Sequence, residues 1–302
     1  MNSDELFMRR CLQLAANGRQ NAKPNPMVGA VIVCEGRIIG EGYHVRCGQS
    51  HAEVNAFSSV KPCDLENLRR STIYVSLEPC CHFGKTPPCA DLIIQKGVKR
   101  VVVGCLDPFS KVAGKGVEKL QHAGIEVTVG VLEEECKRLN CTFFTFHEKH
   151  RPFITLKWAQ SSNGFIDNNF HPYRFSNSYT QMLVHKLRRE HDAILVGRIT
   201  EDREHPQLNV REWVGRNPKK IVCSHTKPLP TVISELYSDG IQSLLVEGGR
   251  QTLQWFIDNN LFDEIRIEIS DVNITTGTLA PRIPSTIDNS KIHRLYHPYR
   301  LQ

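Results

Sequence analysis

The order of strand-like and helix-like segments restricts the fold of this 302-residue chain more than any other property. Short apolar runs that suit buried strands alternate with amphipathic segments that suit helices. The alternation stops at a basic, aromatic stretch, residues 146–152, and then starts again. Such alternation is typical of α/β domains with mostly parallel sheets. We therefore expect two α/β domains, at residues 1–149 and 150–302.

The first series predicts helices at 3–18, 51–60, 90–95, 114–122 and 132–141, and strands at 28–33, 37–43, 73–77, 100–104 and 125–131. The second series predicts strands at 153–158, 193–197, 220–223, 243–247 and 264–269, and helices at 179–189, 230–237 and 251–259. The run at 100–104 is continuously apolar, which is typical of a parallel strand buried on both faces.

Composition excludes some classes of protein. No apolar run approaches the roughly 20 residues that a membrane span needs, and the N-terminus lacks the pattern of an export signal. The 11 cysteines are odd in number and have no repeated spacing, which favours reduced thiols and a cytoplasmic location. The net charge of +6 suits an anionic ligand but does not require one.

A short motif carries the chemistry of the first domain. His51, Cys80 and Cys89 provide three ligands of the kinds that hold catalytic zinc, with the fourth position open. Glu53 is not needed as a ligand, so it can move protons between a water and a substrate. The order His-x-Glu followed by Pro79-Cys80 is typical of zinc deaminases, although the usual motif has only two residues between its cysteines.

A closed zinc site that only stabilises the fold is the alternative, with Cys81 or His82 as the fourth ligand. It would leave Glu53 without a role. Cys81 follows Cys80 directly, so binding of both to one metal would strain the backbone. We interpret Cys81 as a bystander, with a redox-sensitive thiol as the remaining alternative.

Further motifs surround these residues: PNPMVGAVIV (24–33), GYH (42–44), HAEVNA (51–56), LEPC (77–80), HFGKTPPC (82–89) and KVAGKG (111–116). Together they resemble the bifunctional deaminase–reductases of riboflavin biosynthesis over residues 1–150. The resemblance implies a cytidine-deaminase-like, three-layer domain with one Zn2+. It also implies hydrolytic removal of the 2-amino group from 2,5-diamino-6-(5-phosphoribosylamino)pyrimidin-4(3H)-one.

Residue by residue, the resemblance implies zinc ligation by His51, Cys80 and Cys89 and proton transfer by Glu53. The substrate contacts that it implies are Asn25, His44, His82 and Lys85. An Asn side chain suits a pyrimidine edge, and Lys and His suit a phosphate. Other interpretations stay open: turn chemistry for Asn25, a core histidine for His44 and a solvated loop charge for Lys85.

The second half resembles the reductase domain of the same family, which has a dihydrofolate-reductase-like α/β fold and uses NADPH. The resemblance implies substrate binding by Lys157, Arg188, Glu204, Arg211 and Glu247, and NADPH binding by Ala159, Thr200 and Gly249. The glycine pair 248–249 would let backbone N–H groups at a helix start approach a phosphate; a plain tight turn is the alternative.

Three departures from the family pattern affect this domain. Residues 172–176 replace a segment that supplies an aromatic cofactor contact, and Glu204-His205-Pro206 replaces an Asp-Asp-Pro loop. The connection between Ser224 and Pro230 is considerably shorter than in the family, where it includes another strand. The short connection predicts a shortened domain with a smaller sheet, and a catalytically impaired domain is the alternative.

The sequence therefore predicts an enzyme that deaminates and then reduces a small phosphorylated pyrimidine. One alternative is a deaminase whose second domain has become a scaffold. Another is a non-catalytic, zinc-stabilised binding protein, and it leaves Glu53 unexplained. Nucleic-acid deamination is disfavoured because the chain lacks a basic patch with interleaved aromatic residues. We expect no membrane or nucleic-acid partner, and a homo-oligomer remains open.

Overall fold

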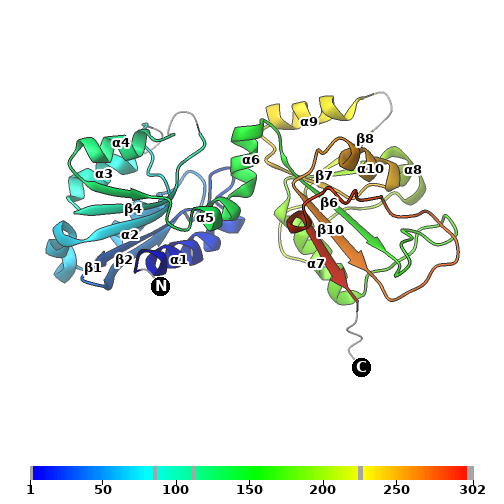
Figure 1. Cartoon of the computed structure of the whole chain (residues 1–302), viewed down its shortest axis with the longest axis horizontal. Helices are drawn as coiled ribbons and strands as arrows, with labels where there is room; N and C mark the ends of the chain where they lie inside the picture. The colour runs from blue at the N-terminus through cyan, green and yellow to red at the C-terminus, as the bar shows by residue number, and fades with distance from the viewer. Residues whose placement is uncertain (1–2, 84–86, 110–112, 224–226, 298–302) are drawn as a thin grey trace. The chain divides into compact units, whose positions relative to one another are not determined.

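The computed structural model describes residues 3–83, 87–109, 113–223 and 227–297. The chain forms two compact units, Met1–Lys149 and His150–Gln302 (Figure 1). Each unit is built around one sheet with helices packed on it. The predicted α/β class is confirmed for both.

The elements of the first unit, in which η denotes a 3-10 helix, are α1 (Ser3–Ala16), η1 (Asn17–Gln20), β1 (Gly29–Cys34), β2 (Arg37–Tyr43), α2 (Ala52–Ser58), η2 (Pro62–Arg70), β3 (Thr72–Leu77), α3 (Cys89–Lys96), β4 (Arg100–Cys105), α4 (Lys115–His122), β5 (Glu126–Val129), α5 (Glu133–Leu139) and α6 (Cys141–Lys149). The strand order is β2-β1-β3-β4-β5. Strand β1 is antiparallel to β2 and β3, whereas β3, β4 and β5 are parallel.

Helices cover both faces of this sheet (Figure 1). Met8 of α1 and Cys136 of α5 belong to the core on one face. Phe57 of α2, Ile93 of α3 and Leu120 of α4 belong to the core on the other. The side chains of β4 alternate between these two cores, which explains its unbroken apolar sequence. The predicted three-layer arrangement is confirmed.

The elements of the second unit are β6 (Phe153–Gln160), α7 (Ser178–Glu190), β7 (Ala193–Gly197), α8 (Arg198–Glu204), β8 (Lys219–Cys223), α9 (Leu229–Ser238), β9 (Ser243–Val246), α10 (Arg250–Asp258), β10 (Glu264–Ile269), η3 (Asn289–Lys291) and β11 (Ile292–Tyr296). The strand order is β11-β10-β6-β9-β7-β8, and every neighbouring pair is parallel.

Two cores flank this second sheet. Helices α9 and α10 pack on one face through Leu236 and Phe256, and α7 packs on the other through Leu187. Helices α6 and α8 and strand β11 were not predicted. Within the described residues no strand lies between β8 and α9. No described helix combines the length and the apolar character that a membrane crossing requires.

A buried ion pair ties the start of α1 to the sheet of the first unit. Arg100 donates from Nη1 and Nη2 to the two carboxylate oxygens of Asp4 at 3.0 and 2.9 Å. The Tyr74 hydroxyl donates to Asp4 Oδ1 at 2.8 Å. The Arg100 hydrogen bonds hold the pKa of Asp4 below its ordinary value, although burial acts in the opposite direction.

We expect Asp4→Asn to lower the free energy of unfolding by about 1–3 kcal/mol at pH 7, because charge-assisted hydrogen bonds are lost. The folded-state pKa lies below the unfolded value of 3.8. The contribution is therefore present above that value and disappears as the pH falls through the folded-state pKa. Urea unfolding at neutral and at strongly acidic pH measures the difference in the free energy of unfolding between wild type and variant.

Glu5→Gln is the matched control for this experiment. Glu5 is the next acidic residue of α1, and its exposed side chain makes only a 3.9 Å ion pair with Arg9. Exposed pairs of this kind contribute little to stability. If the difference in the free energy of unfolding between wild type and Asp4→Asn is the same in acid as at neutral pH, the stabilising role of the Asp4–Arg100 ion pair is contradicted.

Candidate functional site

Three predicted metal ligands lie at the ends of secondary-structure elements. His51 is the residue before α2, Cys80 follows β3, and Cys89 is the first residue of α3. Helix α2 packs on β1 and β2 and contacts α3, and β1 lies next to β3, so the three ends lie close together. The helix starts add a positive electrostatic field, which favours negative charge in the ligand cluster.

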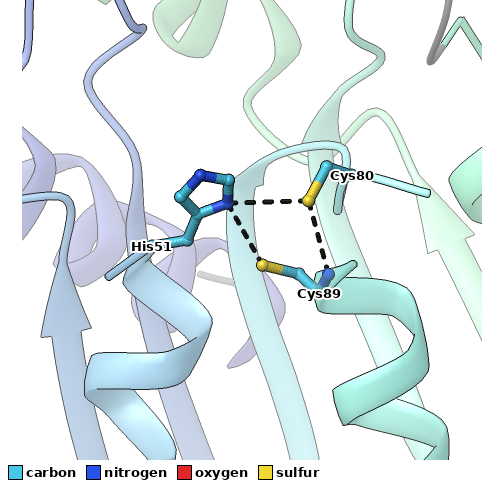
Figure 2. A group of neighbouring side chains, drawn as sticks. All are labelled: His51, Cys80 and Cys89. Atoms are coloured by element: carbon cyan, nitrogen blue, oxygen red, sulfur yellow. Dashed lines mark hydrogen bonds between the residues drawn. The ribbon is translucent and has the colours of Figure 1, made fainter. Parts of the chain in front are cut away.

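The ligand atoms of these residues face one another (Figure 2). His51 Nδ1 lies 3.5 Å from Cys80 Sγ and 3.3 Å from Cys89 Sγ. The three ligand atoms all lie within 4.8 Å of one another. One imidazole nitrogen and two sulfurs in this arrangement are donors that zinc prefers. The residues therefore fit a zinc ion, toward which His51 would present Nδ1.

Gly42 allows α2 to lie close enough to β2 for this arrangement. A Cβ atom at Gly42 would stand 2.3 Å from the backbone nitrogen of Ala56 and 2.6 Å from the carbonyl oxygen of Ala52. Any larger residue would push α2 away from the sheet. His51 and Glu53 would then move with the first turn of the helix.

Hydrogen bonds between the ligands distribute charge unequally over the two sulfurs. The Cys89 thiol bonds to Cys80 and lowers the pKa of Cys80, and His51 acts in the same direction. The same bond, together with burial, raises the pKa of Cys89. The Cys89 backbone N–H also donates to Cys80 Sγ at 3.3 Å. Cys80 is therefore the better thiolate of the pair.

Glu53 lies in the first turn of α2, and only 3% of it is exposed. Burial raises the pKa of Glu53, and the negative charge of Cys80 adds to that effect. The carboxyl group lies beside the ligand cluster, where it interacts with His51 and Cys89. A carboxyl group at this position can exchange protons with neighbouring groups.

His44 and Asn25 form a linked pair next to the cluster. The rings of His44 and His51 are 5.5 Å apart, edge to face. His44 Nδ1 lies 3.1 Å from the carbonyl oxygen of Ser50, which can only accept, so Nδ1 carries the proton. Nε2 must then accept from Asn25 Nδ2, also at 3.1 Å. Burial lowers the pKa of His44, which keeps the ring neutral.

The remaining predicted residues of the first site lie in the loop after Cys80. His82 is exposed, and its ring lies 6.2 Å from that of Phe109. Burial raises the pKa of Cys81, which disfavours the reactive thiolate and so the redox-sensitive alternative. Lys85 lies outside the described residues.

Glu78 is a residue whose role the sequence analysis missed. Its buried carboxylate accepts from the backbone N–H groups of Gly116, Gly114, Val117 and Asp107, at 2.9, 2.9, 3.2 and 3.2 Å. It thus anchors the start of α4 two residues before Cys80. The LEPC motif could have indicated this role. A carboxylate that follows an apolar, buried strand needs hydrogen-bond donors from the protein.

The second unit gathers charged side chains on one face of its sheet. Lys157 on β6 stands between Glu247, which follows β9, and Glu268 on β10. Lys157 Nζ lies 3.8 Å from Glu268 Oε2. All three side chains are largely buried. Lys157 and Glu247 were predicted, whereas Glu268 was not.

Arg188 on α7 completes this group through a two-pronged contact with Glu247. Its Nε and Nη2 donate to the two Glu247 oxygens at 3.1 and 2.7 Å. Its Nη1 donates to the carbonyl oxygen of Asn209 at 3.3 Å, and Arg211 donates to the Asn209 side chain at 3.1 Å. Burial alone would raise the pKa of Glu247, but Arg188 and Lys157 lower it below its ordinary value.

The predicted cofactor residues lie at neighbouring element ends. Gly249 immediately precedes α10, and a Cβ atom there would stand 3.1 Å from Thr200 Oγ1 of α8. Ala159 on β6 is level with Glu268 of β10. Glu204, which was predicted to bind the substrate rather than the cofactor, is the last residue of α8 and is exposed. The structure thus places Thr200 beside Gly249 at the start of α10.

The altered stretch 172–176 also reaches this site. Phe175 is buried, with its ring 4.9 Å from that of Tyr173. Ser176 Oγ donates to Glu268 Oε2 at 2.8 Å. The stretch therefore contributes a hydroxyl contact to Glu268. The sequence predicted only that this stretch lacks the aromatic cofactor contact of the family.

Two family models match the chain. Residues 1–105 match the cytidine and deoxycytidylate deaminase zinc-binding region. Residues 152–234 and 228–288 match the RibD C-terminal domain. The first match spans the three ligand residues, and the second spans the charged group of the second unit.

Related proteins match both units together. The riboflavin biosynthesis protein RibD of Aquifex aeolicus is 39% identical, over 88% of this chain and 86% of that protein. RibD of Bacillus amyloliquefaciens is 32% identical, over 93% and 88%. A crystal structure from Thermotoga maritima, described as a diaminohydroxyphosphoribosylaminopyrimidine deaminase/5-amino-6-(5-phosphoribosylamino)uracil reductase, is 35% identical with a TM-score of 0.83, covering 95% and 93%. The chain belongs to the RibD family of riboflavin biosynthesis deaminase–reductases.

Proposed function

We propose that the first unit removes the 2-amino group of 2,5-diamino-6-(5-phosphoribosylamino)pyrimidin-4(3H)-one by hydrolysis. The observation that carries the proposal is the convergence of His51 Nδ1 and the Cys80 and Cys89 sulfurs within 4.8 Å, with the buried Glu53 beside them. Three protein ligands leave one position open, which is typical of catalytic rather than structural zinc. Zinc, when bound, supplies Lewis-acid activation of water near neutral pH.

Glu53 accepts a proton from the attacking water and delivers it to the departing amino group, which leaves as ammonia. The carbon thereby exchanges its C–N bond for a C–O bond, and no oxidant or reductant is needed. A carboxylate that ligated the metal could not move between the two positions. This role uses the location of Glu53 in the first turn of α2, two residues after His51.

Asn25 and His44 orient the pyrimidine in this proposal. His44 holds the Asn25 amide by a 3.1 Å hydrogen bond, which fixes the groups that Asn25 presents to a base edge. His82 and Lys85 belong to the loop after Cys80, and we assign them to the phosphoribosyl part of the substrate. The assignment of Lys85 rests on its place in the sequence and its chemical type, and that of His82 also on its exposed position after Cys80.

We propose that the second unit reduces the ribosyl chain of 5-amino-6-(5-phosphoribosylamino)uracil to the ribityl chain. Lys157, Arg188 and Arg211 provide cationic groups for its phosphate and hydroxyl oxygens. Glu247 holds Arg188 in place by two hydrogen bonds. NADPH, when bound, supplies the hydride, and its phosphates suit the backbone N–H groups at the start of α10, beside Gly249 and Thr200.

The reductase assignment predicts that NADPH is oxidised only when the deaminated pyrimidine is supplied. Lys157→Ala should raise KM for that compound by roughly tenfold or more, since a largely desolvated charge-assisted contact is lost. Absorbance of NADPH measures both results. Lys219→Ala is the control, because Lys219 is an exposed lysine of the same sheet that pairs with Asp239.

A deaminase with a second unit that acts only as a scaffold is the alternative. It is favoured by the altered stretch 172–176 and by exposed Glu204 in place of an aspartate. Under this alternative ammonia is released from the diamino compound, but NADPH is neither bound nor oxidised, even at millimolar concentration. Saturable NADPH turnover would exclude it.

A further inference from the structure

Glu268 is a buried carboxylate to which neither proposed reaction assigns a role. It lies on β10 and is 4% exposed. Besides Lys157, it accepts from Ser176 Oγ at 2.8 Å and lies 2.7 Å from His297 Nε2, directly after β11. Three segments far apart in the sequence therefore meet at one side chain.

Strand register places Lys157 between two carboxylates. Leu156 is level with Val246, so the next position puts Lys157 level with Glu247. On the other side Arg266 is level with Lys157, and Glu268 follows two residues later on the same face. A row of alternating charge thus crosses the sheet from Arg188 to Glu268.

Glu247 and Glu268 differ in their cationic partners. Glu247 makes two hydrogen bonds to Arg188, so its charge is already balanced. Glu268 has no arginine partner among the described residues, and its Oε2 lies 3.8 Å from Lys157 Nζ. At that distance Lys157 and Glu268 form an ion pair, but Nζ and Oε2 are too far apart for a hydrogen bond. Within the described part of the chain the Lys157 ammonium makes no hydrogen bond, so its N–H donors remain for a ligand.

We propose that Glu268 is a positioning residue that holds the Lys157 ammonium between β9 and β10, where its N–H donors remain available to the reductase substrate. Without Glu268 the ammonium would be drawn to Glu247, where it would compete with Arg188. His297 and Ser176 hold Glu268 in turn. His297, directly after β11, thus supports the substrate site through Glu268. This inference rests on the reductase function proposed above.

The test is reductase kinetics with saturating NADPH and varied 5-amino-6-(5-phosphoribosylamino)uracil. Glu268→Gln should raise KM by about tenfold, the scale of coupling within one salt-bridge network, with a much smaller change in kcat. Glu268→Asp keeps the charge and should recover part of the affinity. His297→Gln should raise KM in the same direction by a smaller factor.

A double variant separates positioning from general damage. In a Lys157→Ala background, Glu268→Gln should raise KM no further, because the group that it positions has gone. Glu264→Gln is the matched control: Glu264 lies on the same strand but pairs with Arg266 and His293, and the wild-type KM is expected. A kcat near the wild-type value at saturating substrate reports that the second unit of each variant, to which all the substituted residues belong, has folded.

The outcomes are distinct. A wild-type protein that never oxidises NADPH would refute the proposed reductase function itself. An active wild type with an unchanged KM in Glu268→Gln would overturn only the positioning role. Additive effects of Glu268→Gln and Lys157→Ala would overturn it too. Should Glu268→Gln fail to fold, Glu268→Asp and His297→Gln carry the same comparison.

Discussion

Glu53→Gln is expected to retain about one zinc per chain and to lose deamination by roughly two orders of magnitude or more, the usual contribution of a general acid–base group. The amide has the size of the carboxylate but cannot accept the proton that water must lose. Zinc is retained because Glu53 does not belong to the ligand cluster of His51, Cys80 and Cys89. Metal analysis and ammonia release under saturating substrate measure the two properties on one sample.

Glu66→Gln is a suitable control for this loss, since Glu66 is an exposed glutamate of η2 in the same unit. It should keep both zinc and activity. Ammonia release near the wild-type rate in Glu53→Gln would remove Glu53 from the mechanism. Loss of zinc together with activity would instead assign it a role in holding the metal.

Cys80→Ser and Cys89→Ser should each abolish tight zinc binding and with it deamination, because a serine hydroxyl is not ionised near neutral pH and binds zinc poorly. Cys81→Ser should keep the zinc. The comparison is sharp because Cys80 and Cys81 are adjacent, and only Cys80 belongs to the ligand cluster. Zinc content after dialysis against a weak chelator measures the effect.

Contradictory results are easy to recognise here. Zinc that survives in Cys89→Ser would mean that another residue completes the site. Zinc lost in Cys81→Ser would revive the closed structural site with Cys81 as a ligand. Reductase turnover by the second unit of these variants serves as an internal check that the rest of the chain is intact.

The first unit was largely predictable because its signals are local. The apolar run of β4 predicts a strand buried on both faces, and its residues do lie in two cores. The ligand residues occur in short motifs, and each lies at an element end that the motif itself sets. Helix α6 was missed because its basic and aromatic residues suggested a linker. In the structure Phe143 and Phe144 of α6 are buried in the core beside α1.

The second unit was less predictable because its site depends on strand order. Lys157 and Glu268 are neighbours only because β10 lies next to β6, although the two residues are 111 positions apart in the sequence. No local pattern specifies that pairing. Strand β11 was missed for a related reason: only Ile292 of its five residues is buried, so it shows no apolar run.

The hydrogen bonds of His44 have a consequence for the discrimination of ligands. A side-chain amide normally offers its two ends interchangeably, since rotation by half a turn exchanges oxygen and nitrogen. At Asn25 the exchange would point the amide oxygen at the lone pair of His44 Nε2. The Asn25 amide is therefore fixed in one orientation. It can then distinguish a base edge from one in which hydrogen-bond donors and acceptors are exchanged. Aspartate, although equal in size, would lack the donor that this lock requires.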